Sequence, residues 1–227
     1  MTLDSSQLGT AAWGFNIDDL AGLAPALSAF LATRPRRPEV LAVGEPTHGE
    51  PAFPTVRNRA FGELVERGFR SIAIESDAVA GLIVDDYVQG RGGDLDTTMA
   101  DGFSHGFQRL NVNRDLVAWM RAYNDIQETG MRLAFYGFDA PLEMTLAPSP
   151  RHYLKYLHSY LSSNLGFGIV LHTREVLDEL LGEERRWTNP AALMDAGKSI
   201  GASPEAVTLR AVADDLLTAL YGHAPTW

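Results

Sequence analysis

Cysteine is absent from this sequence of 227 residues. Its absence excludes disulfide bonds, thiolate metal ligands and a cysteine nucleophile together. A long apolar run is also absent, since no window approaches the roughly 20 apolar residues that a membrane-spanning helix needs. The first residues, MTLDSSQLGTAAWGFN, have neither the basic region nor the apolar region of a secretory signal. We therefore expect a cytoplasmic protein.

Positive charge is scarce as well. The chain has 19 Lys and Arg against 29 Asp and Glu, which gives a net charge of -10 and a pI near 5.0. Nucleic acids and anionic membrane surfaces would repel such a protein, so we expect neither as a partner. A small molecule is the expected partner, and the sequence leaves the oligomeric state open.

Short apolar runs and amphipathic stretches alternate over the first part of the chain. Strands are expected at residues 40–43, 71–74 and 131–138, and helices at 56–67, 78–89 and 114–128, after a first helix that Asn16 caps and that ends before TRPRRP at 33–38. Because the apolar runs are continuous, they are typical of strands covered on both faces. The pattern predicts an α/β fold with a parallel sheet flanked by helices.

The pattern changes after Asp139 and becomes largely helical. Helices are expected at residues 152–161, at 176–181 and from Ser203 to Leu220, while FGIVL at 167–171 fits a fourth strand or a helix. We expect a single domain over 1–227, with a sheet-containing half at 1–145 and a helical portion at 146–227. Three strands are few for this class of sheet, which favours a truncated chain.

Titratable residues follow the predicted strands. Glu45 and His48 lie in LAVGEPTHGE after the first strand, Glu75 and Asp77 end the second, and Asp139 ends the third. In open parallel sheets, ligands bind outside the carboxyl ends of the strands, so these five residues are expected at one edge. A histidine among carboxylates can perform general acid and base hydrolysis.

Each residue also has a plainer interpretation. His48 can be a hydrogen-bonded loop residue, Glu45 a helix cap or an arginine partner, Asp77 the cap of the next helix and Asp139 a turn residue. Glu75 is harder to dismiss, because its strand is otherwise apolar and a carboxylate near a buried strand end needs a partner.

Two other chemistries use the same region. His48 and Glu50, with Glu75 or Asp139, could hold a metal ion, although the chain has no HExxH spacing. A serine nucleophile lacks its usual motif, since no GxSxG occurs. We expect neither a metal nor a cofactor, and a metal-dependent hydrolase remains the alternative.

The ordered motifs of residues 40–139 resemble the N-terminal half of the erythromycin esterase family. The segments that carry this resemblance are GEPTHGE, VRNRAFGELVERGF, SIAIESD, DDYVQG, LVAWMRAYN and LAFYGFD. The resemblance implies hydrolysis of a macrolide ester, or of a related ester, by a water molecule without a serine nucleophile. It places the general base at His48, a carboxylate partner at Glu75 and a charge-stabilising arginine at Arg57. Glu45, Asp77 and Asp139 would have supporting roles.

The sequence departs from this family in two places. Family members carry a later histidine motif of the form HNAH, and none follows Asp139. The segment FSHGFQRL also differs from the residues that usually follow GF, and we interpret His105 in it as a surface loop histidine. The missing motif favours a second hypothesis, a catalytically incomplete module that binds the ligand or serves resistance without turnover.

Overall fold

The computed structural model describes residues 13–47, 49–140, 149–165, 170 and 172–223. Contacts divide the chain into two compact units. One unit comprises residues 1–74, 83–101 and 106–136, and the other comprises residues 75–82, 102–105 and 137–227. The second unit includes residues 75–77 and 137–139, which are the carboxyl ends of the two strands of the sheet.

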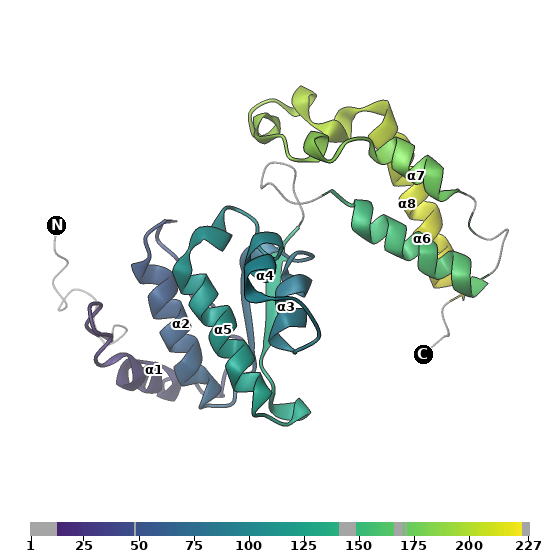
Figure 1. Ribbon diagram of the computed structural model, residues 1–227. Helices are drawn as coiled ribbons and strands as arrows, with labels where there is room; N and C mark the ends of the chain where they lie inside the picture. The colour runs from purple at the N-terminus through teal and green to yellow at the C-terminus, as the bar shows by residue number, and fades with distance from the viewer. Residues whose placement is uncertain (1–12, 48, 141–148, 166–169, 171, 224–227) are drawn as a thin grey trace. The chain divides into compact units, whose positions relative to one another are not determined.

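The helices predicted at 56–67, 78–89 and 114–128 are present within about one turn of their expected bounds. In chain order the helices and 3-10 turns of this part are α1 (Leu23–Ala32), α2 (Ala52–Val65), α3 (Gly81–Val88), α4 (Leu95–Asp101), η3 (Phe107–Arg109), α5 (Asn111–Asp125) and η4 (Thr129–Met131). Helix α4 and the 3-10 turns η3 and η4 lie outside the predicted helices. Helices α2 and α5 lie side by side (Figure 1). Phe61 of α2 packs edge to face against Trp119 of α5, and the centroids of the two rings are 5.8 Å apart.

The sheet of the described residues has two strands, β1 (Ser71–Asp77) and β2 (Ala134–Asp139). The Ala134 amide donates to the Arg70 carbonyl, and the Ala78 amide donates to the Asp139 carbonyl, each at 2.8 Å. These bonds join the starts of the two strands and the ends of the two strands, so the strands are parallel. The predicted α/β class with a parallel sheet is confirmed.

The outer edge of β2 is covered by a side chain of α3 and by that of Gln89, the residue after this helix. Asp85 accepts the Phe135 amide at 3.0 Å, and the Gln89 amide donates to the Leu133 carbonyl at 2.8 Å. An uncovered edge would leave strand N–H and C=O groups unpaired. These two side chains therefore provide bonds that a further strand would otherwise make.

The prediction of a strand at residues 40–43 is wrong. This segment has no regular structure, and the side chains of Val40 and Val43 are 83% and 56% exposed. An apolar run records hydrophobicity, whereas a strand also needs a neighbour to accept and donate its backbone bonds. Among the described residues, β1 pairs with β2 alone.

The first helix begins later than predicted. Asn16 accepts the Asp18 amide, and Asp19 accepts the Ala21 amide, each at 2.8 Å. These bonds form turns within the segment and do not cap a helix, because such side chains compete with helical bonding. Gly22 then adopts a left-handed conformation with φ of 87°, and α1 starts at Leu23.

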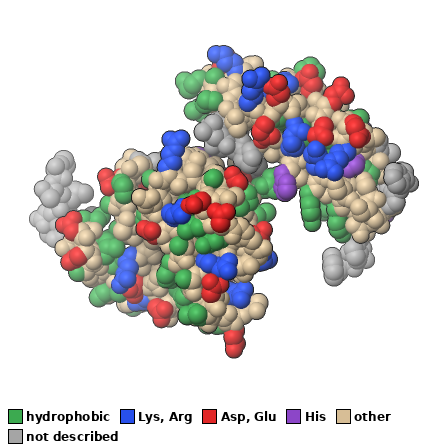
Figure 2. Space-filling model, in the orientation of Figure 1, with side chains coloured by type: hydrophobic (Ala, Val, Ile, Leu, Met, Phe, Trp, Pro, Cys, Tyr) green, Lys and Arg blue, Asp and Glu red, His purple; other side chains and the backbone are tan. Residues whose placement is uncertain are grey.

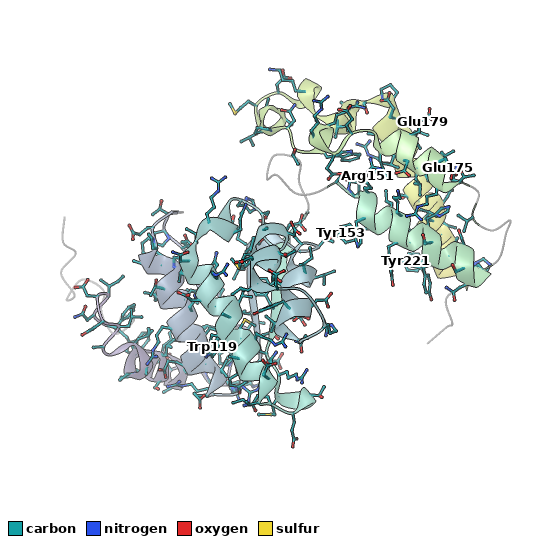
Figure 3. All side chains as sticks on the ribbon, in the orientation of Figure 1. Trp119, Arg151, Tyr153, Glu175, Glu179 and Tyr221 are labelled. Atoms are coloured by element: carbon teal, nitrogen blue, oxygen red, sulfur yellow. The ribbon has the colours of Figure 1, made fainter. Side chains whose placement is uncertain are left out.

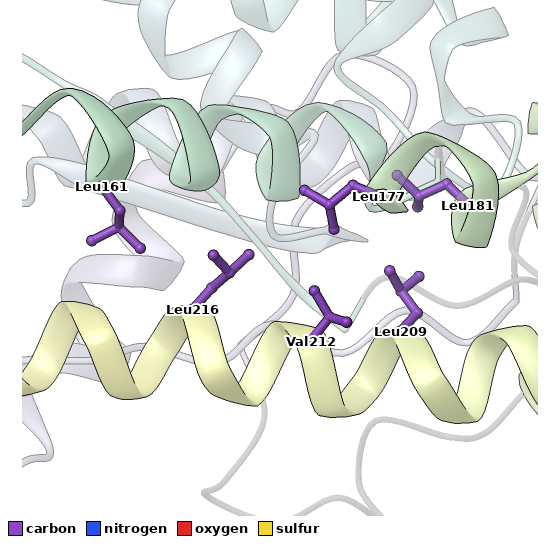
Figure 4. Close-up of a cluster of buried hydrophobic side chains, with 6 residues drawn as sticks. All are labelled: Leu161, Leu177, Leu181, Leu209, Val212 and Leu216. Atoms are coloured by element: carbon purple, nitrogen blue, oxygen red, sulfur yellow. The ribbon is translucent and has the colours of Figure 1, made fainter. Parts of the chain in front are cut away.

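The helical portion is built from α6 (Arg151–Leu165), α7 (Arg174–Leu181) and α8 (Pro204–His223), and the three predicted helices are confirmed. Short 3-10 turns join α7 to α8 at Glu184–Trp187, Pro190–Leu193, Ala196–Lys198 and Ile200–Ala202. Apolar side chains of the three helices form a buried cluster of Leu161, Leu177, Leu181, Leu209, Val212 and Leu216 (Figure 4). Most of the predicted strand or helix at 167–171 lies outside the described residues.

Ser203 caps α8, as its position before Pro204 predicts. Its hydroxyl oxygen accepts the Ala206 amide at 3.2 Å, which satisfies one of the orphan donors of the first turn. No helix in the described part of the chain is both long enough and apolar enough to cross a bilayer.

Basic and acidic side chains gather together over the helical portion (Figure 2). Asp178 of α7 accepts the Lys155 ammonium with both carboxylate oxygens, at 2.9 and 2.8 Å, and also pairs with Arg151. The hydrogen bond from Lys155 is the main cause that lowers the pKa of Asp178. These contacts tie α6 to α7.

The Asp178 contacts predict a pH-dependent contribution to stability. A carboxyl whose pKa is lower in the folded state stabilises the fold above its unfolded pKa of about 3.9, and the contribution is lost as the pH falls through the folded value. Asp178→Asn should therefore lower the midpoint of thermal unfolding slightly at pH 7, and the difference from wild type should vanish well below pH 4. Glu179→Gln on the same helix (Figure 3) is the control, and its midpoint of thermal unfolding at pH 7 should match that of wild type. A difference that persists at low pH would contradict the assignment.

Candidate functional site

The side chains of β1 alternate between exposed and buried as far as Ser76, and the last two residues are both buried. Glu75 is exposed, whereas Ser76 and Asp77 are buried. The Asp77 carboxylate accepts the Val79 and Ala80 amides with Oδ1, at 2.7 and 2.8 Å. It thereby holds the turn that precedes α3, which is close to the capping role that the sequence allowed. Its Oδ2 is buried and has no hydrogen bond among the described residues.

A loop between α4 and η3 is fastened to this strand end by two serines. The Ser104 amide donates to the Ser76 hydroxyl at 3.0 Å, and the Asp77 amide donates to the Ser104 hydroxyl at 2.8 Å. Both side chains are buried. These two hydrogen bonds fix the loop, because a buried hydroxyl or amide group without a hydrogen-bond partner would destabilise the fold.

The next residue of the loop, His105, meets the end of β2. Its Nε2 lies 2.8 Å from Asp139 Oδ2, and the two side chains are 26% and 24% exposed. His105 has a left-handed backbone with φ of 59°, which is uncommon for a residue with a side chain. His105 is an exposed loop residue, as the sequence predicts, and its ring is in addition paired with Asp139 at the strand edge. No local pattern in the sequence signals this contact.

Arg57 lies on α2 and is partly buried. Its Nη2 donates to Asn113 at 2.7 Å and to Asn58 at 2.9 Å, and Asn58 in turn donates to the Val112 carbonyl. Burial lowers the pKa of Arg57, and the negative charge of Glu45 opposes that effect. Arg57 therefore braces α2 against the start of α5 and lies within electrostatic reach of Glu45.

Comparison with known proteins now identifies the family. The family model described as erythromycin esterase matches residues 64–223. The chain belongs to the erythromycin esterase family. A crystal structure of a Bacillus cereus protein is similar, with 16% identity and a TM-score of 0.49, over 93% of this chain and 58% of the other. The chain thus spans little more than half the length of that protein.

The erythromycin esterase match places the predicted residues in two groups. Glu75, Asp77, Asp139 and also His105 lie inside the matched residues, whereas GEPTHGE and Arg57 precede them. The motif around His48 therefore stays a prediction.

The structure brings some of the predicted residues together within each unit. In the first unit the charge of Glu45 acts on Arg57, and in the second the strand ends hold Glu75, Asp77 and Asp139. His48 lies outside the described residues. Within the described ranges, no three His, Asp or Glu side chains are grouped so that they could hold a metal ion.

Proposed function

We propose that this chain hydrolyses a carboxylic ester, the macrolactone of a macrolide antibiotic or a related ester, with a water molecule that His48 activates. Membership of the erythromycin esterase family is the observation that carries this proposal. The placement of acidic residues at the carboxyl ends of β1 and β2 supports it, because ligands of parallel sheets bind there.

The proposed roles follow the chemistry of each side chain. His48 accepts the proton of the attacking water, since an imidazole can exchange protons near neutral pH. Glu75, which is exposed at the end of β1, orients His48. Arg57 stabilises the negative charge that develops on the carbonyl oxygen. Glu45, Asp77 and Asp139 support these groups.

The reaction is a balanced addition of water across the ester bond. The water oxygen forms a bond to the carbonyl carbon while one of its protons passes to His48. The bond between that carbon and the alcohol oxygen then breaks, and the alcohol oxygen takes up a proton. The products are a carboxylic acid and an alcohol, joined in one molecule when the substrate is a macrolactone.

Mass spectrometry of a macrolide and ester panel tests this function. We expect the wild-type chain to add one water to at least one member, with or without a chelator. His48→Ala should lower kcat/KM by about 100-fold or more, the range for a lost general base, and change stability by less than about 1 kcal/mol. His223→Ala, an exposed histidine on α8, is the control with unchanged turnover.

Different outcomes of this experiment separate the alternatives. Retained turnover in His48→Ala would overturn the assigned base, and activity that disappears with the chelator would favour a metal-dependent hydrolase. Ligand binding without product after prolonged incubation would favour the incomplete binding module. A cytoplasmic location and a single-domain organisation also stay predictions.

A further inference from the structure

We propose that His105, oriented by Asp139, is a second proton-transfer residue of this hydrolysis and gives a proton to the leaving alcohol oxygen. The assignment rests on the proposed ester hydrolysis. His105 is then a catalytic residue and Asp139 a positioning residue.

The geometry of the pair suits proton transfer. An ionised carboxylate only accepts hydrogen bonds, so at 2.8 Å from Asp139 the Nε2 atom of His105 carries the hydrogen. The carboxylate thereby fixes the tautomer and the orientation of the ring, as in other pairs where a carboxylate holds a catalytic imidazole. Both side chains keep about a quarter of their surface accessible, so solvent and a ligand can approach.

Both members of the pair are anchored to strand ends. Ser104, directly before His105, exchanges hydrogen bonds with Ser76 and Asp77. The Asp139 carbonyl accepts the Ala78 amide at 2.8 Å. Side chains fixed in this way need little rearrangement when charge develops on a substrate, which is the condition for efficient catalysis.

The backbone at His105 is consistent with a functional constraint. His105 and Gly106 both adopt left-handed conformations, with φ of 59° and 80°. A non-glycine residue in this region is strained, and such strain gathers at functional sites. The His105 ring, directly after the buried Ser104, meets Asp139 from this backbone conformation.

The proton balance assigns one transfer to each histidine. His48 takes a proton from the attacking water as the new carbon–oxygen bond forms. When the bond to the alcohol oxygen breaks, its electron pair stays on that oxygen, which takes a proton from Nδ1 of the His105 imidazolium. The Nε2 hydrogen stays on the ring and continues to be donated to Asp139, whose negative charge balances the imidazolium before transfer. Solvent then removes a proton from His48 and returns one to His105.

Leaving groups of different basicity reveal such a proton donor. An alkoxide leaves poorly unless it is protonated, whereas 4-nitrophenoxide is stable as an anion and needs no donor. The test therefore compares ethyl butyrate with 4-nitrophenyl butyrate on the full chain. The variant is His105→Asn, because asparagine tolerates the left-handed backbone that His105 adopts.

We expect His105→Asn to lower kcat/KM for ethyl butyrate by about 100-fold, the usual scale for a lost general acid, and to leave 4-nitrophenyl butyrate nearly unchanged. Asp139→Asn should show the same selectivity. His48→Ala should lose activity on both esters. His172→Asn is the matched control, since His172 pairs with Asp215 at 3.1 Å in the helical portion, and both esters should react as with wild type.

The outcomes distinguish the assignment from the proposed function. Equal losses on both esters in His105→Asn, or no loss on either, would overturn the role of His105 while the esterase activity stands. Hydrolysis of neither ester by wild type, together with no product from the macrolide panel, would overturn both. Ring nitrogen NMR provides a readout without substrate, in which wild-type His105 should show hydrogen on Nε2 and Asp139→Ala should lose that preference.

Discussion

Gly137→Ala is expected to lower the free energy of unfolding by about 3 kcal/mol, the upper part of the usual range for overpacking. A methyl group on Gly137 would lie 2.4 Å from the Asp77 carbonyl oxygen and 2.6 Å from that of Ser76. Both obstacles are backbone atoms of β1, so no side chain can rotate away. The strands must shift apart, because glycine marks a close approach of two backbones here.

Chemical denaturation measures the effect of Gly137→Ala, with Gly62→Ala as the matched control. Gly62 lies inside α2, and no atom outside its own helix lies within 4 Å of a Cβ added there. Alanine should therefore stabilise that helix by about 0.5–1 kcal/mol. Equal stability of Gly137→Ala and wild type would contradict the close packing of β1 against β2. The same variant should also disturb the contact between His105 and Asp139, which follows Gly137 by two residues.

The longer helices and the two paired strands could be predicted because local sequence determines them strongly, whereas the short helix α4 was not predicted. Apolar spacing and a cap at Ser203 located α8, and a continuous apolar run located β1. The run at residues 40–43 has the same local character and forms no strand. Its difference from β1 lies in the partner, since β1 pairs with a segment some sixty residues away and residues 40–43 have no strand beside them among the described residues. A local pattern carries no information on that pairing.

The residues of the candidate site also divide into those that the sequence locates and one that depends on a contact between distant segments. The rule that ligands meet the carboxyl ends of parallel strands led to Glu75, Asp77 and Asp139, and the structure places all three at the strand ends. It could not lead to His105, which reaches Asp139 across 34 positions through a loop fastened by two buried serines. Serines and glycines in a loop usually indicate a turn, and the tertiary contacts of Ser104 convert this loop into a support for a histidine.

Leu177→Ala is expected to destabilise the helical portion by about 2–5 kcal/mol, the range for removing a large buried aliphatic side chain. Leu177 is 0% exposed and belongs to the cluster that joins α6, α7 and α8 (Figure 4). Truncation removes apolar contacts and leaves a cavity that the helices fill only in part. Alanine has a higher helix propensity than leucine, but the gain is only a fraction of about 1 kcal/mol. The destabilisation from the lost contacts and the cavity is therefore larger.

Hydrogen exchange of the backbone amides is the measurement that locates the effect of Leu177→Ala. Amides of α6, α7 and α8 should exchange faster, because these helices owe their stability to the shared cluster more than to their own propensity. The control is Val176→Ala on the preceding residue of α7, whose side chain is 37% exposed and lies outside the cluster. Unchanged exchange in Leu177→Ala would show that the three helices are held by something other than this core. Faster exchange in α6 and α8 as well as α7 would show that they unfold as one cooperative unit, so any ligand bound by one of them would stabilise all three.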